Sequence, residues 1–200
     1  MSATLSFYNE NSARLATQYD SLSFESVHRS WSDYWPRAGG AVLDVGAGSG
    51  RDARWFLNNG CTVTAVEPAH DLRQLAMLNS SPQIQWLDDS LPELARVCEL
   101  AGQYDLILIS AVWMHLTSQQ RVESMKSLSL LLTENGKLVV TLRHGCFDDR
   151  RETFGVSVDE IKQLAEANGL FACLVADGED SLKRAGIAWQ TVVLESNNPV

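Results

Sequence analysis

The sequence predicts an α/β protein built on a mostly parallel β-sheet. Short apolar runs rich in β-branched residues alternate with longer segments whose apolar residues recur every three or four positions, the patterns of buried strands and amphipathic helices. Between the first two runs lies a glycine-rich turn, at residues 46–50. The 200 residues, 45% of them hydrophobic, are enough for one good core, which favours a single globular unit.

Charge and composition narrow the classes of partner. The formal net charge is −9, and an acidic surface repels phosphate backbones, so a nucleic-acid partner is disfavoured. Runs of about 18 apolar residues are absent, and the first residues do not pair a basic region with an apolar one. We therefore expect a cytoplasmic protein without a membrane partner. The four cysteines are scattered without metal-ligand spacing, so we predict no bound metal.

Residues 1–40 have a different pattern of apolar residues from the rest of the chain and are predicted to form an N-terminal helical cap. Their large apolar residues recur at three- and four-residue steps, which indicates one or two amphipathic helices before the domain of residues 41–200. Two roles remain open, since the cap either covers one flank of the sheet or closes over a ligand.

The most informative stretch, residues 41–67, reads as strand, glycine turn, helix and strand. Gly46, Gly48 and Gly50 alternate with small residues, so the backbone can turn tightly and bring its amides close to a ligand. Glu67 closes the second strand, where a carboxylate can accept hydrogen bonds from both hydroxyls of a ribose. The unit predicts half of a nucleotide-binding domain.

The glycine spacing decides which nucleotide is expected. A dinucleotide-binding turn needs its third glycine where Arg51 stands, so that assignment fails. The spacing Asp-x-Gly-x-Gly-x-Gly, starting at Asp44, instead resembles motif I of the class I S-adenosylmethionine-dependent methyltransferases. The resemblance covers about residues 41–195. It implies a Rossmann-like three-layer sandwich, a seven-stranded sheet whose last strand is antiparallel, and S-adenosyl-L-methionine as the cofactor.

The resemblance also implies a set of cofactor-binding residues. They comprise the glycine turn, the end of the second strand, the acids after the third strand, a serine after the fourth and a tyrosine of the cap: Asp44, Gly46, Ala47, Gly48, Gly50, Arg51, Glu67, Pro68, Asp88, Asp89, Ser110 and Tyr19. Asp88 best matches the position that binds adenine in the family. The same Asp-Asp-Ser sequence is also good capping chemistry for a helix starting near residue 91.

The remaining elements follow in order along the chain. We predict strands at residues 83–87, 104–110, 137–142, 170–176 and 187–195, and helices at residues 69–78, 117–132 and 158–168. Residues 196–200 are expected to be disordered.

Candidate catalytic and substrate-binding residues lie after the fourth and fifth strands. His115 titrates near neutral pH and could accept a proton, and His144 is a second candidate. By resemblance, Trp113 lines the substrate cavity, and Tyr8 or Tyr19 faces the methionine end of the cofactor. Arg143 leaves its strand at the active edge, where a guanidinium could clamp a carboxylate or phosphate. Core packing for Trp113, a structural hydrogen bond for His115 and local ion pairs for the arginine-rich loop remain alternatives.

Together these features predict an S-adenosylmethionine-dependent methyltransferase that acts on a small molecule by direct in-line transfer. Two alternatives remain. One is methylation of a protein or RNA, and the other is a non-catalytic S-adenosylmethionine-binding regulatory module.

Overall fold

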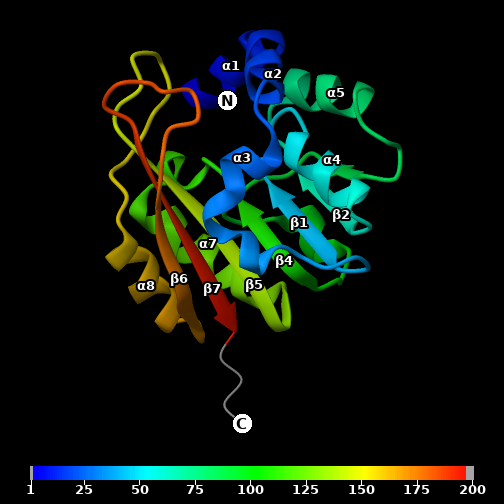
Figure 1. Ribbon diagram of the computed structural model, residues 1–200, viewed down its shortest axis with the longest axis vertical. Helices are drawn as coiled ribbons and strands as arrows, with labels where there is room; N and C mark the ends of the chain where they lie inside the picture. Colours follow the sequence, from blue (N-terminus) through cyan, green and yellow to red (C-terminus); the bar gives the residue numbers. More distant parts are fainter. Residues whose placement is uncertain (1, 197–200) are drawn as a thin grey trace.

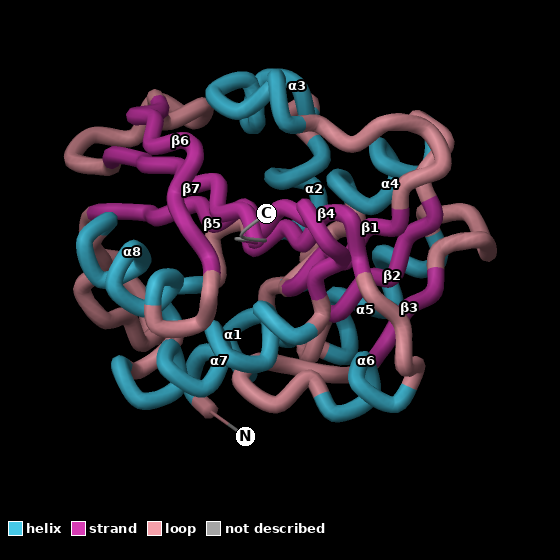
Figure 2. Tube along the Cα trace, turned by 90° about the horizontal axis from the view of Figure 1, so that it is seen from below, coloured by secondary structure: helices cyan, strands magenta, loops and turns pink. Residues whose placement is uncertain are grey.

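The computed structural model describes residues 2–196 and shows a seven-stranded sheet between two layers of helices (Figures 1 and 2). The strand order is β3-β2-β1-β4-β5-β7-β6. Strands β1 to β5 pair in parallel, and β7 lies antiparallel between β5 and β6. The predicted fold class is confirmed. The strands are β1 Ala41–Val45, β2 Thr62–Val66, β3 Gln85–Leu87, β4 Tyr104–Ile109, β5 Leu132–His144, β6 Leu170–Gly178 and β7 Ala188–Ser196.

Helices cover both faces of the sheet. One face packs against α3 (Phe24–His28), the 3-10 helix η1 (Arg29–Tyr34) and α4 (Arg51–Asn58), and the other against α6 (Ala95–Glu99), α7 (Ser118–Leu130) and α8 (Val158–Glu166). Because the central strands are buried on both faces, their sequences are continuously apolar rather than alternating. In β1, for example, Val42 packs into one layer while Leu43 and Val45 pack into the other.

Several strands and helices begin or end at residues other than those predicted, and the difference is largest for β5. It starts at Leu132, because Tyr104 of β4 already pairs there ahead of an irregularity in register, and it runs to His144, which pairs with Ala188 of β7. Residues 133–136 therefore belong to the strand rather than to a loop. Ser196 ends β7, so its predicted disorder is wrong. That prediction for residues 197–200 falls outside the described residues.

The N-terminal segment forms α1 (Ala3–Glu10), α2 (Ser12–Asp20), α3 and η1. Figure 1 shows α1 and α2 above the carboxyl ends of the parallel strands, beside α5 (His70–Leu78). Phe24 of α3 anchors the segment by stacking on Trp55 of α4 at 3.8 Å between ring centroids. In residues 2–196, every helix is too short or too polar to cross a bilayer.

Candidate active site

The glycine turn after β1 adopts a conformation that side chains would not tolerate. Gly46, Gly48 and Gly50 all have positive φ, at 75°, 57° and 79°. A Cβ atom on Gly46 would lie 2.3 Å from Cγ2 of Val112. Glycine is therefore required here for backbone geometry and for space.

Glu67 links the end of β2 to this turn. Its Oε2 accepts a hydrogen bond from the Gly48 amide at 2.9 Å, and its Oε1 accepts one from the Ala69 amide at 2.8 Å. Burial raises the pKa of this carboxyl, and the two amides offset part of that rise. Each oxygen keeps a further lone pair, so the carboxylate is held ready to accept hydroxyl groups, as the ribose prediction requires.

Behind the turn, the Asp52 carboxylate is hydrogen-bonded to both Arg51 and His28. It accepts two hydrogen bonds from Arg51, at 2.6 and 2.9 Å, and one from His28 Nε2 at 2.9 Å. His28 Nδ1 in turn accepts a hydrogen bond from Trp31. Burial alone would raise the pKa of Asp52, but its contacts with His28 and Arg51 hold that pKa well below the usual range. Arg51 and Asp52 both line the cavity described below.

Three predicted cofactor-binding side chains do not face that cavity. Asp44 lies buried beneath the turn, and burial raises its pKa well above the ordinary value. Asp89 instead accepts hydrogen bonds from the amides of Arg96 and Val97 in the first turn of α6, which begins at Ala95 rather than near residue 91 as predicted. Asp88 pairs with Arg73 at 2.9 Å. Neither acid lines the cavity, whereas the following Ser90 and Leu91 do, and the adenine contact expected of Asp88 stays a prediction.

A cavity of about 1130 Å³ connects the glycine turn with the carboxyl ends of β4 and β5 and the amino end of the antiparallel β7. Eleven predicted site residues line it: Tyr8, Tyr19, Gly46, Ala47, Gly48, Arg51, Glu67, Pro68, Ser110, His115 and Arg143. Gly50 does not contribute to the wall, because it faces Trp86 and Arg54. Residues from the N-terminal helices and from β5 thus meet in one space.

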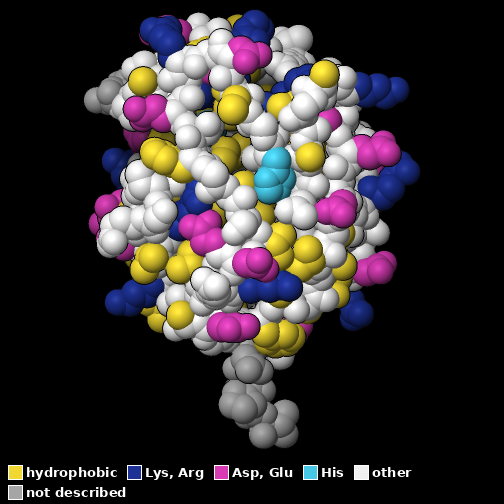
Figure 3. Space-filling view, turned by 90° about the vertical axis from the view of Figure 1, so that its left-hand side faces the viewer, with side chains coloured by type: hydrophobic (Ala, Val, Ile, Leu, Met, Phe, Trp, Pro, Cys, Tyr) yellow, Lys and Arg dark blue, Asp and Glu magenta, His cyan; other side chains and the backbone are white. Residues whose placement is uncertain are grey.

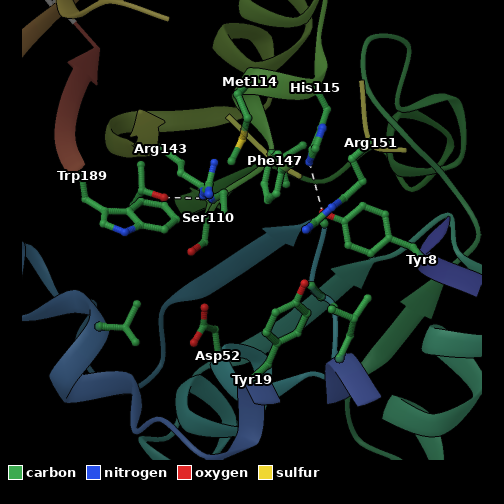
Figure 4. A pocket seen from close by; sticks show the side chains of 18 of the residues that line it. Tyr8, Tyr19, Asp52, Ser110, Met114, His115, Arg143, Phe147, Arg151 and Trp189 are labelled. Carbon is green, nitrogen blue, oxygen red and sulfur yellow. Dashed lines mark hydrogen bonds between the residues drawn. The ribbon is translucent and has the colours of Figure 1, made fainter. Parts of the chain in front are cut away.

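Tyr8 and His115 form a hydrogen-bonded pair in this cavity (Figure 4). His115 Nδ1 lies 2.8 Å from the Glu152 carbonyl, which can only accept, so Nδ1 carries the proton. His115 Nε2 then accepts from the Tyr8 hydroxyl at 3.1 Å. Burial lowers the pKa of His115 and raises that of Tyr8. The histidine is held neutral, with its accepting nitrogen directed at the tyrosine.

A stack of three side chains forms another wall. The Phe147 ring lies between two guanidinium groups, with Cζ of Arg143 3.8 Å and Cζ of Arg151 3.6 Å from its centroid. Trp189 of β7 lies beside Arg143 (Figure 4). The sequence did not identify Phe147, Trp189 or Asp52 as site residues, because neither glycine spacing nor strand ends mark them.

Trp113 and His144 are not in this cavity. Trp113 is completely buried in the core layer that contains α7 and α8, so the prediction that it lines the substrate cavity is corrected in favour of core packing. His144 follows Arg143 on β5 and so points to the opposite face, where its Nε2 lies 3.0 Å from Oε1 of Gln190. Its predicted catalytic role is therefore corrected as well.

The fold and this glycine turn define an S-adenosylmethionine-dependent enzyme of the Rossmann-like class. The family model described as "Methyltransferase domain" matches residues 15–195, and the chain belongs to this family. The buried carboxylate of Glu67 fits the ribose of the cofactor, and the turn of glycines and small residues leaves room for its methionine part.

Relatives and solved structures agree with this assignment. The chain is 28% identical over 164 residues to an uncharacterized methyltransferase of Bacillus licheniformis, covering 72% of this chain and 70% of the relative. It is 27% identical over 135 residues to malonyl-[acyl-carrier protein] O-methyltransferase of Halalkalibacterium halodurans, covering 65% of this chain and 49% of that protein. It thus spans only about half the length of some relatives.

Two solved structures share the fold at low sequence identity. The 1,6-didemethyltoxoflavin-N1-methyltransferase of Burkholderia thailandensis has a TM-score of 0.71 and 16% identity, covering 98% of this chain and 88% of that one. The magnesium protoporphyrin IX methyltransferase of Synechocystis, with bound S-adenosylmethionine, has a TM-score of 0.65 and 16% identity, covering 95% of this chain and 84% of that one.

Proposed function

We propose that this methyltransferase acts on a small molecule by direct in-line methyl transfer. The cavity carries the proposal, because its volume of about 1130 Å³ exceeds the roughly 300–1,000 Å³ typical of one ligand site. It extends from the glycine turn past Ser110 to Arg143 and Trp189, which leaves room for an acceptor beside the cofactor.

The cofactor, when bound, supplies a sulfonium methyl group that is already a strong electrophile. The protein's main contribution is to hold the acceptor in line and exclude water, and orientation alone can supply up to about 7–11 kcal/mol. The N-terminal helices support this role, since they place Tyr8 and Tyr19 in the cavity. We assign α1 and α2 as a cap over this site, whereas α3 and η1 cover one face of the sheet.

Tyr8 and His115 provide a route for a proton. A hydroxyl or amine acceptor loses its proton to the Tyr8 oxygen. At the same time Tyr8 passes its own proton to His115 Nε2, along the hydrogen bond that already connects the two side chains. The Glu152 carbonyl then stabilises the resulting imidazolium through Nδ1. His115 thus acts through Tyr8 rather than by touching the acceptor.

The surface favours a small acceptor over a nucleic acid. Lys, Arg, Asp and Glu side chains are interspersed on the face shown in Figure 3, without one continuous basic patch. The two solved structures with this fold are named for small-molecule substrates, 1,6-didemethyltoxoflavin and magnesium protoporphyrin IX. We also propose a cytoplasmic location, which the four free cysteines support.

Methyl-labelled S-adenosylmethionine tests the proposal. The protein is incubated with the labelled cofactor and a cell extract, which is then separated into small-molecule, protein and RNA fractions. We expect label in the small-molecule fraction. Label confined to protein or RNA would contradict the proposed acceptor class, and transfer to no fraction would favour a regulatory module.

A further inference from the structure

The far end of the cavity is built on one face of the β5–β7 pair. Arg143 pairs directly with Trp189, and two residues away on each strand Thr141 pairs with Thr191. Because side chains two apart on a strand share a face, all four project to the same side of the sheet, and all four line the cavity. Figure 4 shows Arg143 and Trp189 side by side there.

Arg143 differs from its neighbours Arg151 and Arg184, which also line the cavity. Arg151 pairs with Asp149 at 2.6 Å, and Arg184 pairs with Asp180 at 2.6 Å. Within residues 2–196, no carboxylate lies within ion-pair distance of Arg143. Arg143 is nevertheless only 6% exposed, and its Nε is buried without a hydrogen-bond acceptor.

The surroundings give this positive charge no directly paired carboxylate. The Arg143 Nη1 donates to the Gly145 carbonyl at 2.7 Å, while its Nη2 makes only a long contact of 3.4 Å with the Cys146 carbonyl. Burial lowers the pKa of Arg143, the neighbouring Arg184 and Arg151 lower it further, and Asp180 offsets only part of that fall. A buried cation without a directly paired anion is costly, so an anionic ligand would be favoured at this position.

We propose that the acceptor is a carboxylic acid whose carboxylate binds Arg143 while its flat apolar body packs against Trp189. The inference rests on the proposed function and specifies its substrate class. A single carboxylate fits better than a phosphate, because the neighbouring Arg151 and Arg184 are already paired with acids and two N–H groups of Arg143 already face carbonyls.

The carboxylate serves as a recognition handle rather than as the methylated group. Phe147 separates Arg143 from the Tyr8–His115 pair, with the His115 ring 5.7 Å and the Arg143 Cζ 3.8 Å from the Phe147 centroid. The acceptor atom that loses a proton to Tyr8 therefore lies apart from the carboxylate. Both faces of Phe147 are covered by arginines, which leaves the Trp189 indole, fixed by its N–H bond to Asp180 at 2.9 Å, to contact the acceptor.

Calorimetric titration of the enzyme saturated with S-adenosylhomocysteine tests this inference. The probes are benzoate, 4-hydroxybenzoate and indole-3-carboxylate, each compared with its primary amide. We expect the parent to bind at least one acid about tenfold or more tightly than the matching amide. Arg143→Gln should remove that preference. Arg143→Lys should retain part of it, because lysine keeps the positive charge but cannot donate two parallel N–H bonds to a carboxylate.

Arg150→Gln is the matched control. Arg150 lies in the loop that follows β5, pairs with Glu10 at the surface and does not line the cavity, so this variant should keep the parent's preference. Thermal melting of each variant shows whether it is folded. Equal binding of acids and amides by the parent, binding of no acid, or an unchanged preference in folded Arg143→Gln would overturn the inference.

The same titrations separate the two proposals. Failure of the parent to bind S-adenosylhomocysteine would count against the proposed function itself. Cofactor binding and label transfer to small molecules, without any preference for acids, would remove only the carboxylate assignment.

Discussion

The two ends of the cavity are constructed differently. At the glycine-turn end, residues 46–69 position one another, and Glu67 is fixed by two backbone amides from the same segment. The acceptor end is assembled from α1, the loop after β5, and the β5–β7 pair, and its Arg143 has no acidic partner. Cofactor affinity should therefore depend on one short segment, whereas acceptor specificity depends on contacts between distant parts of the chain.

The largest effect is expected at the glycine-turn end, from Asp52 behind the turn. Asp52→Ala would leave Arg51 and His28 without their buried partner, so we expect a loss of about 3–5 kcal/mol of unfolding free energy, measured by chemical denaturation. Because the folded-state pKa of Asp52 is lowered, its contribution is present above the unfolded value of about 3.9 and is lost as pH falls below it. Asparagine does not titrate, so when the pH is lowered from 5 to about 3 the unfolding free energy of Asp52→Asn should fall less than that of the parent.

Gly48→Arg should disable the cofactor end alone. The turn requires a φ of 57°, and a Cβ there would lie 3.4 Å from Tyr19, so the arginine would strain the turn and fill the cavity. We expect calorimetry to show a loss of about 100-fold or more in S-adenosylmethionine affinity. Gly102→Arg, at a glycine with open space around it, is the control and should bind as the parent does.

Glu67→Ala should weaken the cofactor end without closing it. Loss of the hydrogen bonds to a charged acceptor predicts roughly 10- to 100-fold weaker cofactor binding, with a smaller loss for Glu67→Gln, which keeps one accepting oxygen. Parent-like calorimetric affinity in Glu67→Ala would show that the ribose lies elsewhere.

Tyr8→Phe should affect the acceptor end alone. With an acceptor that releases a proton, we expect a decrease of about tenfold in kcat and little change in cofactor affinity, because only the hydroxyl that joins the acceptor to His115 is removed. Steady-state kinetics and calorimetry measure the two quantities. An unchanged kcat would exclude Tyr8 from the proton route.

The pH dependence of the parent supplies a finer test. Neutral His115 is the active form, and its pKa is lowered from about 6.5, so the rate should hold at neutral pH and fall only as pH drops below that value. Tyr8→Phe should change this acidic limb in a pH–rate profile. A limb centred above pH 6.5 in the parent would contradict the assignment.

The sequence identified the cofactor end because its signals are local. Glycine spacing, a strand end and Glu67 all lie within one short segment, and the fold follows from the alternation of strands and helices. The acceptor end depends on register and on strand faces, which a single sequence does not determine. Arg143 and His144 were equally good candidates until β5–β7 pairing placed them on opposite faces, and Trp189 becomes a neighbour of Arg143 only through that pairing.

A crystal structure with bound S-adenosylhomocysteine tests the central assignment most directly. We expect both ribose hydroxyls within hydrogen-bond distance of Glu67, the homocysteine end beside the glycine turn, and the sulfur facing the space between Tyr8 and Arg143. Density for the ligand away from Glu67, or a sulfur turned from that space, would contradict the account.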